Sequence, residues 1–355
     1  MKKYAIVAAL FTLLLSACST DFDIAADYEE TLVVYGLLDA SQDTQYIRIS
    51  RGFISADRSA LEVALEPDSI YYLADQLAVT IERESDGAVF TFTEDRSIAK
   101  DTGVFGVAPH LVYALPQKLE ANDAFRLRIE NTVTGKIVTS YTSMVDSFRL
   151  TQPSDIQAFE FTTSLVSKFP NGLPQNIEVT FTAPVDGKVY DVAVRFYYRQ
   201  WEGAVVGPGD TMFVEYLFEK GLVSTSLAGA NPNPGGQPVI ARYFGQDLLA
   251  FIAAELSANP NITREPLQLP LEYVYYAGGQ DLYDMIRTSQ GGTGITALEA
   301  KPIYSNIEGG YGVFSSRFSK TRPNVGINTP SKDSLACGQL TRALNFNVDV
   351  PTSCN

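Results

Sequence analysis

Histidine is nearly missing from this chain of 355 residues, since His110 is the only one. A Ser-His-Asp or Cys-His catalytic arrangement therefore has a single possible base, and no serine lies in a recognisable nucleophile elbow. A zinc site needs several histidine or cysteine ligands, which the sequence does not supply. We expect no cofactor and no metal, and the lone histidine is more simply read as a surface loop residue.

Basic residues are also scarce: 27 Lys and Arg stand against 41 Asp and Glu, for a formal net charge of −14. Phosphate backbones are bound by clustered Lys and Arg, and no such cluster is present, so we expect no nucleic-acid partner. The glycine-rich run at residues 289–294 lacks the lysine followed by Ser or Thr that reaches phosphate in a phosphate-binding loop. That run is expected to be a surface loop.

Cysteine occurs three times, as Cys18, Cys337 and Cys354. The last two form an even pair close to the C-terminus, which could close a disulfide in an oxidising compartment. Two free thiols are the alternative. Neither reading makes these cysteines catalytic.

No apolar run is long enough to span a bilayer, which takes about 20 residues. The longest, at residues 4–15, follows Lys2 and Lys3 and precedes small residues, the order of a cleavable secretory signal. It ends in Leu-Ser-Ala-Cys at residues 15–18, which resembles the lipobox of bacterial lipoproteins. The resemblance implies cleavage before Cys18 and attachment of diacylglycerol and a further acyl chain such as palmitate to that residue. A secreted protein with a chance cysteine is the alternative.

The residues after Cys18 indicate where the anchor is delivered. Ser19 replaces the aspartate that retains lipoproteins at the inner membrane in the familiar sorting rule, so an outer-membrane lipoprotein is expected. Residues 19–23 are loosely similar to acidic surface-export tags, which favours the cell surface over the periplasmic face.

The rest of the chain predicts a mainly β fold with a few helices (α+β). β-type runs at residues 31–38 and 45–53 predict a hairpin, and further runs occupy 77–82, 88–93, 124–130 and 136–141. Their spacing indicates an immunoglobulin-like β-sandwich. The predicted organisation is a signal peptide at 1–17, a lipidated tether at 18–30, the sandwich at 31–145 and a larger β-rich domain at 146–355.

In the larger domain, strands are expected at residues 176–182, 190–201, 212–218, 222–226, 267–277 and 312–318. Apolar residues at three- and four-residue steps predict a helix near 241–257, ending before Asn259 and Pro260. A shorter helix is expected at residues 280–288.

Two sets of side chains are candidates for binding or chemistry. Aromatic residues with polar tips could line a ligand groove or pack in the core instead; they are Tyr197, Tyr198, Trp201, Tyr273, Tyr275 and Tyr276. Asp281 and Asp284 could share one face of the short helix, and paired carboxylates can hydrolyse glycosides. Solvated surface acids are the simpler reading of this pair.

Three segments carry a family resemblance: residues 32–38, residues 45–51 and the motif at residues 302–314. In the motif, Gly309, Gly310 and Gly312 would let the backbone take positive φ before a final strand, while Asn306 and Glu308 could satisfy buried amides. The chain resembles the Bacteroidetes lipoproteins of the domain-of-unknown-function family numbered 4249.

The resemblance implies partners rather than chemistry, because no catalytic residues come with the family. It suggests a non-enzymatic, lipid-anchored accessory or binding protein of a TonB-dependent receptor, assisting uptake of a small-molecule or oligomeric nutrient. A structural or adhesive cell-surface protein is the alternative, and a hydrolase using Asp281 and Asp284 is a second one.

Overall fold

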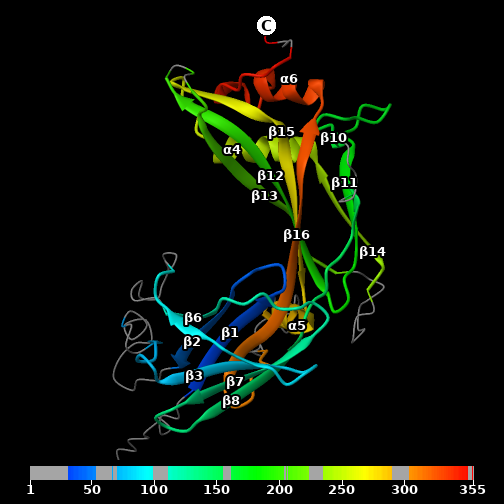
Figure 1. Cartoon of the computed structure of the whole chain (residues 1–355). Helices are drawn as coiled ribbons and strands as arrows, with labels where there is room; N and C mark the ends of the chain where they lie inside the picture. The colour runs from blue at the N-terminus through cyan, green and yellow to red at the C-terminus, as the bar shows by residue number, and fades with distance from the viewer. Residues whose placement is uncertain are drawn as a thin grey trace, which may run out of the picture.

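The computed structural model describes residues 31–52, 66, 70–98, 111–154, 161–203, 205, 207–223, 235–289, 304–350 and 354. The expected mainly β fold is confirmed. Two β-rich bodies lie end to end, and the long strand β16 (Tyr311–Ile327) passes from one to the other (Figure 1). We call them the N-terminal body, which contains β1 to β8, and the C-terminal body, which contains β9 to β15.

The N-terminal body packs two sheets face to face. One side is the four-stranded sheet in the order β4-β3-β7-β8, formed by Val89–Thr91, Leu77–Arg83, Ala124–Asn131 and Ile137–Ser143. The other side belongs to a nine-stranded sheet and contains β1 (Thr31–Asp39), β2 (Gln45–Gly52), β6 (Val112–Leu115) and β5 (Thr93–Asp95). Buried and exposed residues alternate along β1 and β7, as expected of strands with one face in a core.

The predicted hairpin is confirmed, because β1 pairs antiparallel with β2. On its other side β1 pairs in parallel with β16, so that Val33 lies opposite Tyr311 and Asp39 opposite Arg317. The N-terminal body is therefore completed by a strand from the far end of the chain.

The C-terminal body continues the nine-stranded sheet. The strands there are β13 (Asp210–Val223), β12 (Val189–Glu202), β15 (Ile262–Gly278), β16 and the short β10 (Phe161–Thr163). A three-stranded sheet faces them in the order β14-β11-β9, formed by Pro238–Phe244, Asn176–Thr182 and Leu150–Gln152. Helix α4 (Gly245–Glu255) adds Leu248, Leu249 and Ile252 to the core between them.

The remaining elements lie at the junction and at the C-terminal end. Helix α5 (Gln280–Ser289) follows β15 at the junction of the bodies, as the sequence predicted for residues 280–288. Helix α6 (Thr329–Cys337) and the 3-10 turn η3 (Arg342–Leu344) cover the far end of the C-terminal body (Figure 1).

Several boundaries differ from those expected. The run predicted at residues 88–93 is divided between β4 and β5, which belong to different sheets, and the strands predicted at 267–277 and 312–318 are longer, as β15 and β16. The predicted helix near 241–257 begins only at Gly245, because Tyr243 and Phe244 end β14, where alternate side chains are buried. Gly245 lies directly against the backbone of Leu165, a close approach that leaves no room for a Cβ. The strand expected at 212–218 and the described part of the one expected at 222–226 form a single strand, β13, in which Gly221 takes φ +68° and donates its N–H to Asp191.

The two bodies have separate apolar cores. The change occurs between Met144 and Val145, which are both fully buried but belong to different cores. Ile307 and Phe314 return to the core of the N-terminal body although they lie far along the chain. The shared sheet connects the two halves, and Phe318 on β16 packs against both cores.

Candidate functional site

A polar pocket lies where the two bodies meet. Its volume is about 170 Å³, and it is lined by the end of β8, the turn before β12 and the first turn of α5. The lining residues are Tyr141, Thr142, Ser143, Asp186, Lys188, Gln280 and Asp281. Three segments that are distant in the sequence therefore meet at one small cavity.

Buried serines on β16 hold two of these segments in place. Ser316 Oγ donates to the carbonyl of Ser143 (2.6 Å) and accepts from the N–H of Val145 (3.0 Å). Ser315 Oγ accepts from the N–H of Leu282 in the first turn of α5 (3.2 Å). Because Ser315 and Ser316 are fully buried, these bonds form away from water and fix the pocket walls to the strand beneath.

Lys188, the one lysine among the described lining residues, is almost completely buried. Lys188 is 1% exposed, and its ammonium group lies 5.8 Å from the ring centre of Tyr283 on α5. Burial lowers the pKa of Lys188, and the nearby carboxylate of Asp284 partly opposes that shift. Gln280 holds Asp284 in place by donating from Nε2 to Oδ2 (2.8 Å).

Asp281 supplies a carboxyl group on the same helix. Tyr304 donates its hydroxyl to Asp281 Oδ1 at 2.7 Å. Burial raises the pKa of Asp281, although the bond from Tyr304 lowers it. Burial and that same bond raise the pKa of Tyr304, so this hydroxyl keeps its proton and acts as a donor. The pocket thus combines acids, an ammonium group and neutral hydroxyls in a partly dehydrated space.

The six predicted aromatic residues are not brought to one surface. Tyr198, Tyr273 and Tyr275 are buried in the C-terminal core, and Trp201 is 7% exposed. Tyr197 and Tyr276 are half-buried. The alternation of a β-strand explains the division, since neighbouring residues point to opposite faces of a sheet.

Tyr197 belongs to a charged and aromatic cluster on β12, β13 and β15. Its hydroxyl donates to Glu272 (2.9 Å), and Arg195 bonds to both Glu215 (2.6 Å) and Glu272 (3.2 Å). Phe213 contacts the ring of Tyr197 and lies 5.2 Å from the guanidinium carbon of Arg195. Burial works against the charge of Arg195, but its bonds to the two glutamates raise its pKa overall.

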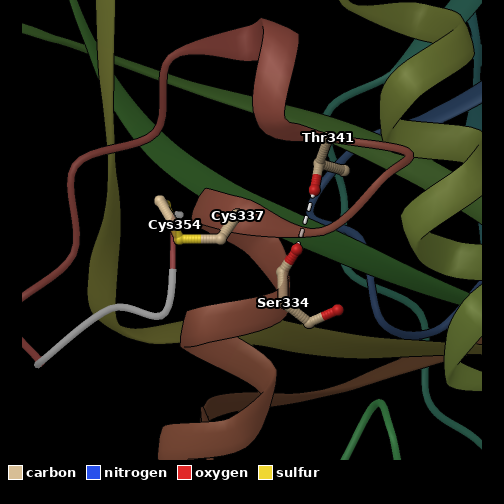
Figure 2. Close-up of a disulfide and its surroundings, with 4 residues drawn as sticks. All are labelled: Ser334, Cys337, Thr341 and Cys354. Carbon is tan, nitrogen blue, oxygen red and sulfur yellow. Dashed lines mark hydrogen bonds between the residues drawn. A yellow bond between two sulfur atoms is a disulfide. The ribbon is translucent and has the colours of Figure 1, made fainter.

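Cys337 and Cys354 form a disulfide with a Cα–Cα distance of 4.9 Å (Figure 2). Cys337 ends helix α6. Thr341, beyond the end of the helix, donates its hydroxyl to the carbonyl of Ser334, which lies one turn before Cys337 (3.0 Å; Figure 2). The bridge lies at the far end of the C-terminal body from the junction pocket, so its role is to hold the C-terminal segment.

Several predicted features fall outside the described residues. These are the signal peptide, the tether with Cys18, His110 and the glycine-rich loop after Ser289. Within the described ranges, no group of three or more His, Cys, Asp or Glu side chains is placed to hold a metal ion. None of the helices described is long and apolar enough to cross a membrane.

Of the pocket residues, the sequence singled out Asp281 only, together with its neighbour Asp284. Lys188 carried one readable signal, since it follows Asp186 and Gly187 and directly precedes the long apolar run of β12. A lysine at the start of such a run is placed at the rim of a core. Residues 141–143 and Gln280 gave no signal of this kind.

The fold and the pocket define a mainly β protein of two bodies that share one sheet and enclose a small polar cavity. The family described as Domain of unknown function (DUF4249) matches residues 19–322, and the chain belongs to that family. No curated protein matches the chain.

Proposed function

We propose that this protein is a non-enzymatic, lipid-anchored binding or accessory protein of an outer-membrane nutrient uptake system. Its partner in this proposal is a TonB-dependent receptor of a Bacteroidetes outer membrane. The observation that carries the proposal is the sequence Leu-Ser-Ala-Cys ending at Cys18, because it resembles a lipobox and a lipid anchor holds a folded body at a membrane without a spanning segment. The acidic net charge suits solubility next to such a surface.

The junction pocket supports a binding role. It is concave, polar and formed by both bodies, and ligand sites are commonly found at the interface between domains. We further propose that the N-terminal body is an immunoglobulin-like sandwich, on the grounds of its two facing antiparallel sheets. In this reading the parallel strand β16 is an addition to that fold.

The test is a mild-detergent pull-down of the tagged protein from its own membranes, with mass spectrometry of what stays bound. A TonB-dependent receptor recovered in near-equal amount is the expected result. The matched control is a Cys18→Ala variant, which should leave the membrane fraction and lose the receptor. Recovery of the wild-type protein alone would contradict the proposal.

An adhesive cell-surface role is a second candidate, favoured by exposed apolar side chains on β13. Met212, Phe213 and Leu217 on this one strand are 42%, 50% and 43% exposed, and neighbouring exposed apolar groups can form a contact surface. A deletion strain that grows normally on all nutrients but attaches poorly to surfaces would favour this role over transport.

A further inference from the structure

Among the described residues that line the junction pocket, acidic side chains outnumber basic ones. Asp186 and Asp281 are acidic, Lys188 is basic, and the acidic Asp284 lies beside the pocket. The charge of Lys188 is already balanced in part, because Asp284 stabilises its protonated form. Asp281 receives neutral hydrogen bonds, from the hydroxyl of Tyr304 and from the side chain of Asn306. Among the described residues no cationic side chain forms an ion pair with Asp281.

The size of the pocket restricts what can neutralise this charge. A cavity of about 150 Å³ holds a molecule of the size of benzene, and the junction pocket has a volume of about 170 Å³. The end of β8 also lines the pocket, and Thr142 and Ser143 there carry hydroxyl groups. The space therefore matches a small polar molecule that carries one positive charge.

We propose that the junction pocket binds a small polar molecule with a primary ammonium group, and that Asp281 is its counter-ion. This inference rests on the proposed function as a binding protein and names the chemical class of the ligand. The ammonium group donates to Asp281, while the rest of the ligand exchanges hydrogen bonds with Thr142, Ser143 and Gln280. A neutral molecule of the same shape binds more weakly, because it dehydrates the Asp281 carboxylate without supplying a charge.

Calorimetric titration of the purified mature protein with two matched pairs of probes tests this. The pairs are D-glucosamine with D-glucose, and L-alaninamide with L-lactamide, in which the first member carries an ammonium group. At least one amine should bind about tenfold or more tightly than its neutral counterpart, as expected for a charge-assisted bond. Equal binding within both pairs, or no binding of either amine at tens of millimolar, would overturn the proposal.

An Asp281→Asn variant assigns the effect to the named carboxyl group. The amide keeps the shape and still accepts from Tyr304, so the fold should be retained, as circular dichroism can verify. Binding of the preferred amine should fall about tenfold or more. Asp86→Asn is the control, since Asp86 lies in the exposed turn between β3 and β4 and bonds to Arg83. Equal binding by both variants would refute the role of Asp281.

The two proposals can fail separately. The titration uses the isolated protein, whereas the receptor is captured from membranes. If Asp281→Asn still recovers the receptor but no amine binds the wild-type protein, the ligand class is wrong and the accessory role stands. If amines bind but no receptor is recovered, the protein is a binding protein that acts without that partner.

Discussion

Asp281 gives the pocket a pH dependence of defined sign. Its pKa is raised by burial and by the neighbouring Asp284, and Tyr304 opposes the shift. Lys188 and Asp186 are the other charged groups among the described residues that line the pocket. Only the ionised carboxylate attracts an ammonium ligand, so binding is complete above the pKa of Asp281 and is lost as the pH falls through it.

We therefore expect amine binding to weaken on acidification at a pH above the ordinary aspartate range. Titrations of the preferred amine at several pH values measure this. The Asp281→Asn variant should bind weakly at every pH and show no acid limb. A wild-type affinity that stays constant down to the ordinary aspartate range would contradict the assignment.

Arg264 on β15 is a second residue with a distinct role, because it fixes the C-terminal segment. It is 3% exposed and donates to Gln200 (3.0 Å), to the carbonyl of Leu344 (2.8 Å) and to the carbonyl of Ser257 (3.2 Å). Lysine cannot reproduce this planar set of donors.

Arg264→Lys should therefore lower the free energy of unfolding by about 2 kcal/mol or more, since buried carbonyls lose their partners. Urea denaturation measures the change. Arg199→Lys is the matched control, because Arg199 is exposed on the adjacent strand β12 and should change stability by less than about 0.5 kcal/mol. Equal losses of unfolding free energy in the two variants would show that the buried hydrogen bonds of Arg264 do not contribute to stability.

For single residues, the sequence predicts which side chains are polar better than it predicts where those side chains lie in the fold. The pairing of Asp281 and Asp284 was readable, because both lie within one short helix. Their meeting with Lys188 and with residues 141–143 was not, since it depends on tertiary contacts between segments that are far apart in sequence. The six aromatic residues show the same limit, because alternation divides them between two faces of the sheet.

Among the elements, the start of β16 depends most closely on single residues. Asn306 accepts from the N–H of Phe314 (2.9 Å) and donates to its carbonyl (2.7 Å), as a side chain satisfying buried backbone groups should. Gly309 and Gly312 take φ +78° and +115°, as expected, while Gly310 does not take positive φ. At Gly312 the parallel strand β1 comes so close that a Cβ would collide with the backbone of Val34.

Gly312→Ala should therefore cost about 3 kcal/mol or more of stability, because a strained φ and a backbone collision act together. Gly135→Ala is the control: Gly135 has φ +73° and open space around it, so only the conformational cost of about 1–2 kcal/mol applies. Both are measured by urea denaturation. A smaller loss for Gly312→Ala than for Gly135→Ala would contradict the close contact between β1 and β16.

The local elements were more predictable than their partners. The hairpin of β1 and β2 has an alternating pattern and a short turn, and both are local signals. The parallel pairing of β1 with β16 places Val33 opposite Tyr311. Neither segment has a sequence pattern that identifies the other as its partner. The helix boundary at Gly245 was missed because the apolar Tyr243 fits both the 3.6-residue period of a helix and the two-residue period of a strand.

For the whole molecule, the consequence is that the two bodies are mechanically joined although their cores are separate. Strand β16 supplies Phe314 to the N-terminal core and Val325 to the C-terminal core. Strands β12 and β15 extend the same sheet beside it. A substitution that destabilises one body should therefore also destabilise the other. The reason is that β16 pairs with strands of both bodies, so unfolding of one body removes pairing partners from the strand that the other body needs.

The single tryptophan makes this testable. Trp201 lies on β12 in the C-terminal body, where it is 7% exposed and donates to the carbonyl of Gly207 (3.3 Å), so its fluorescence reports on that body. Phe314→Ala empties a fully buried site in the other core and should cost about 3–5 kcal/mol. If the bodies unfold together, the urea midpoint seen by Trp201 fluorescence falls and coincides with that seen by circular dichroism.

Tyr311→Ala is the control on the same strand, since Tyr311 is 54% exposed and should leave both midpoints in place. A fluorescence midpoint that Phe314→Ala does not move, beside a biphasic dichroism curve, would mean that the shared sheet does not couple the two bodies.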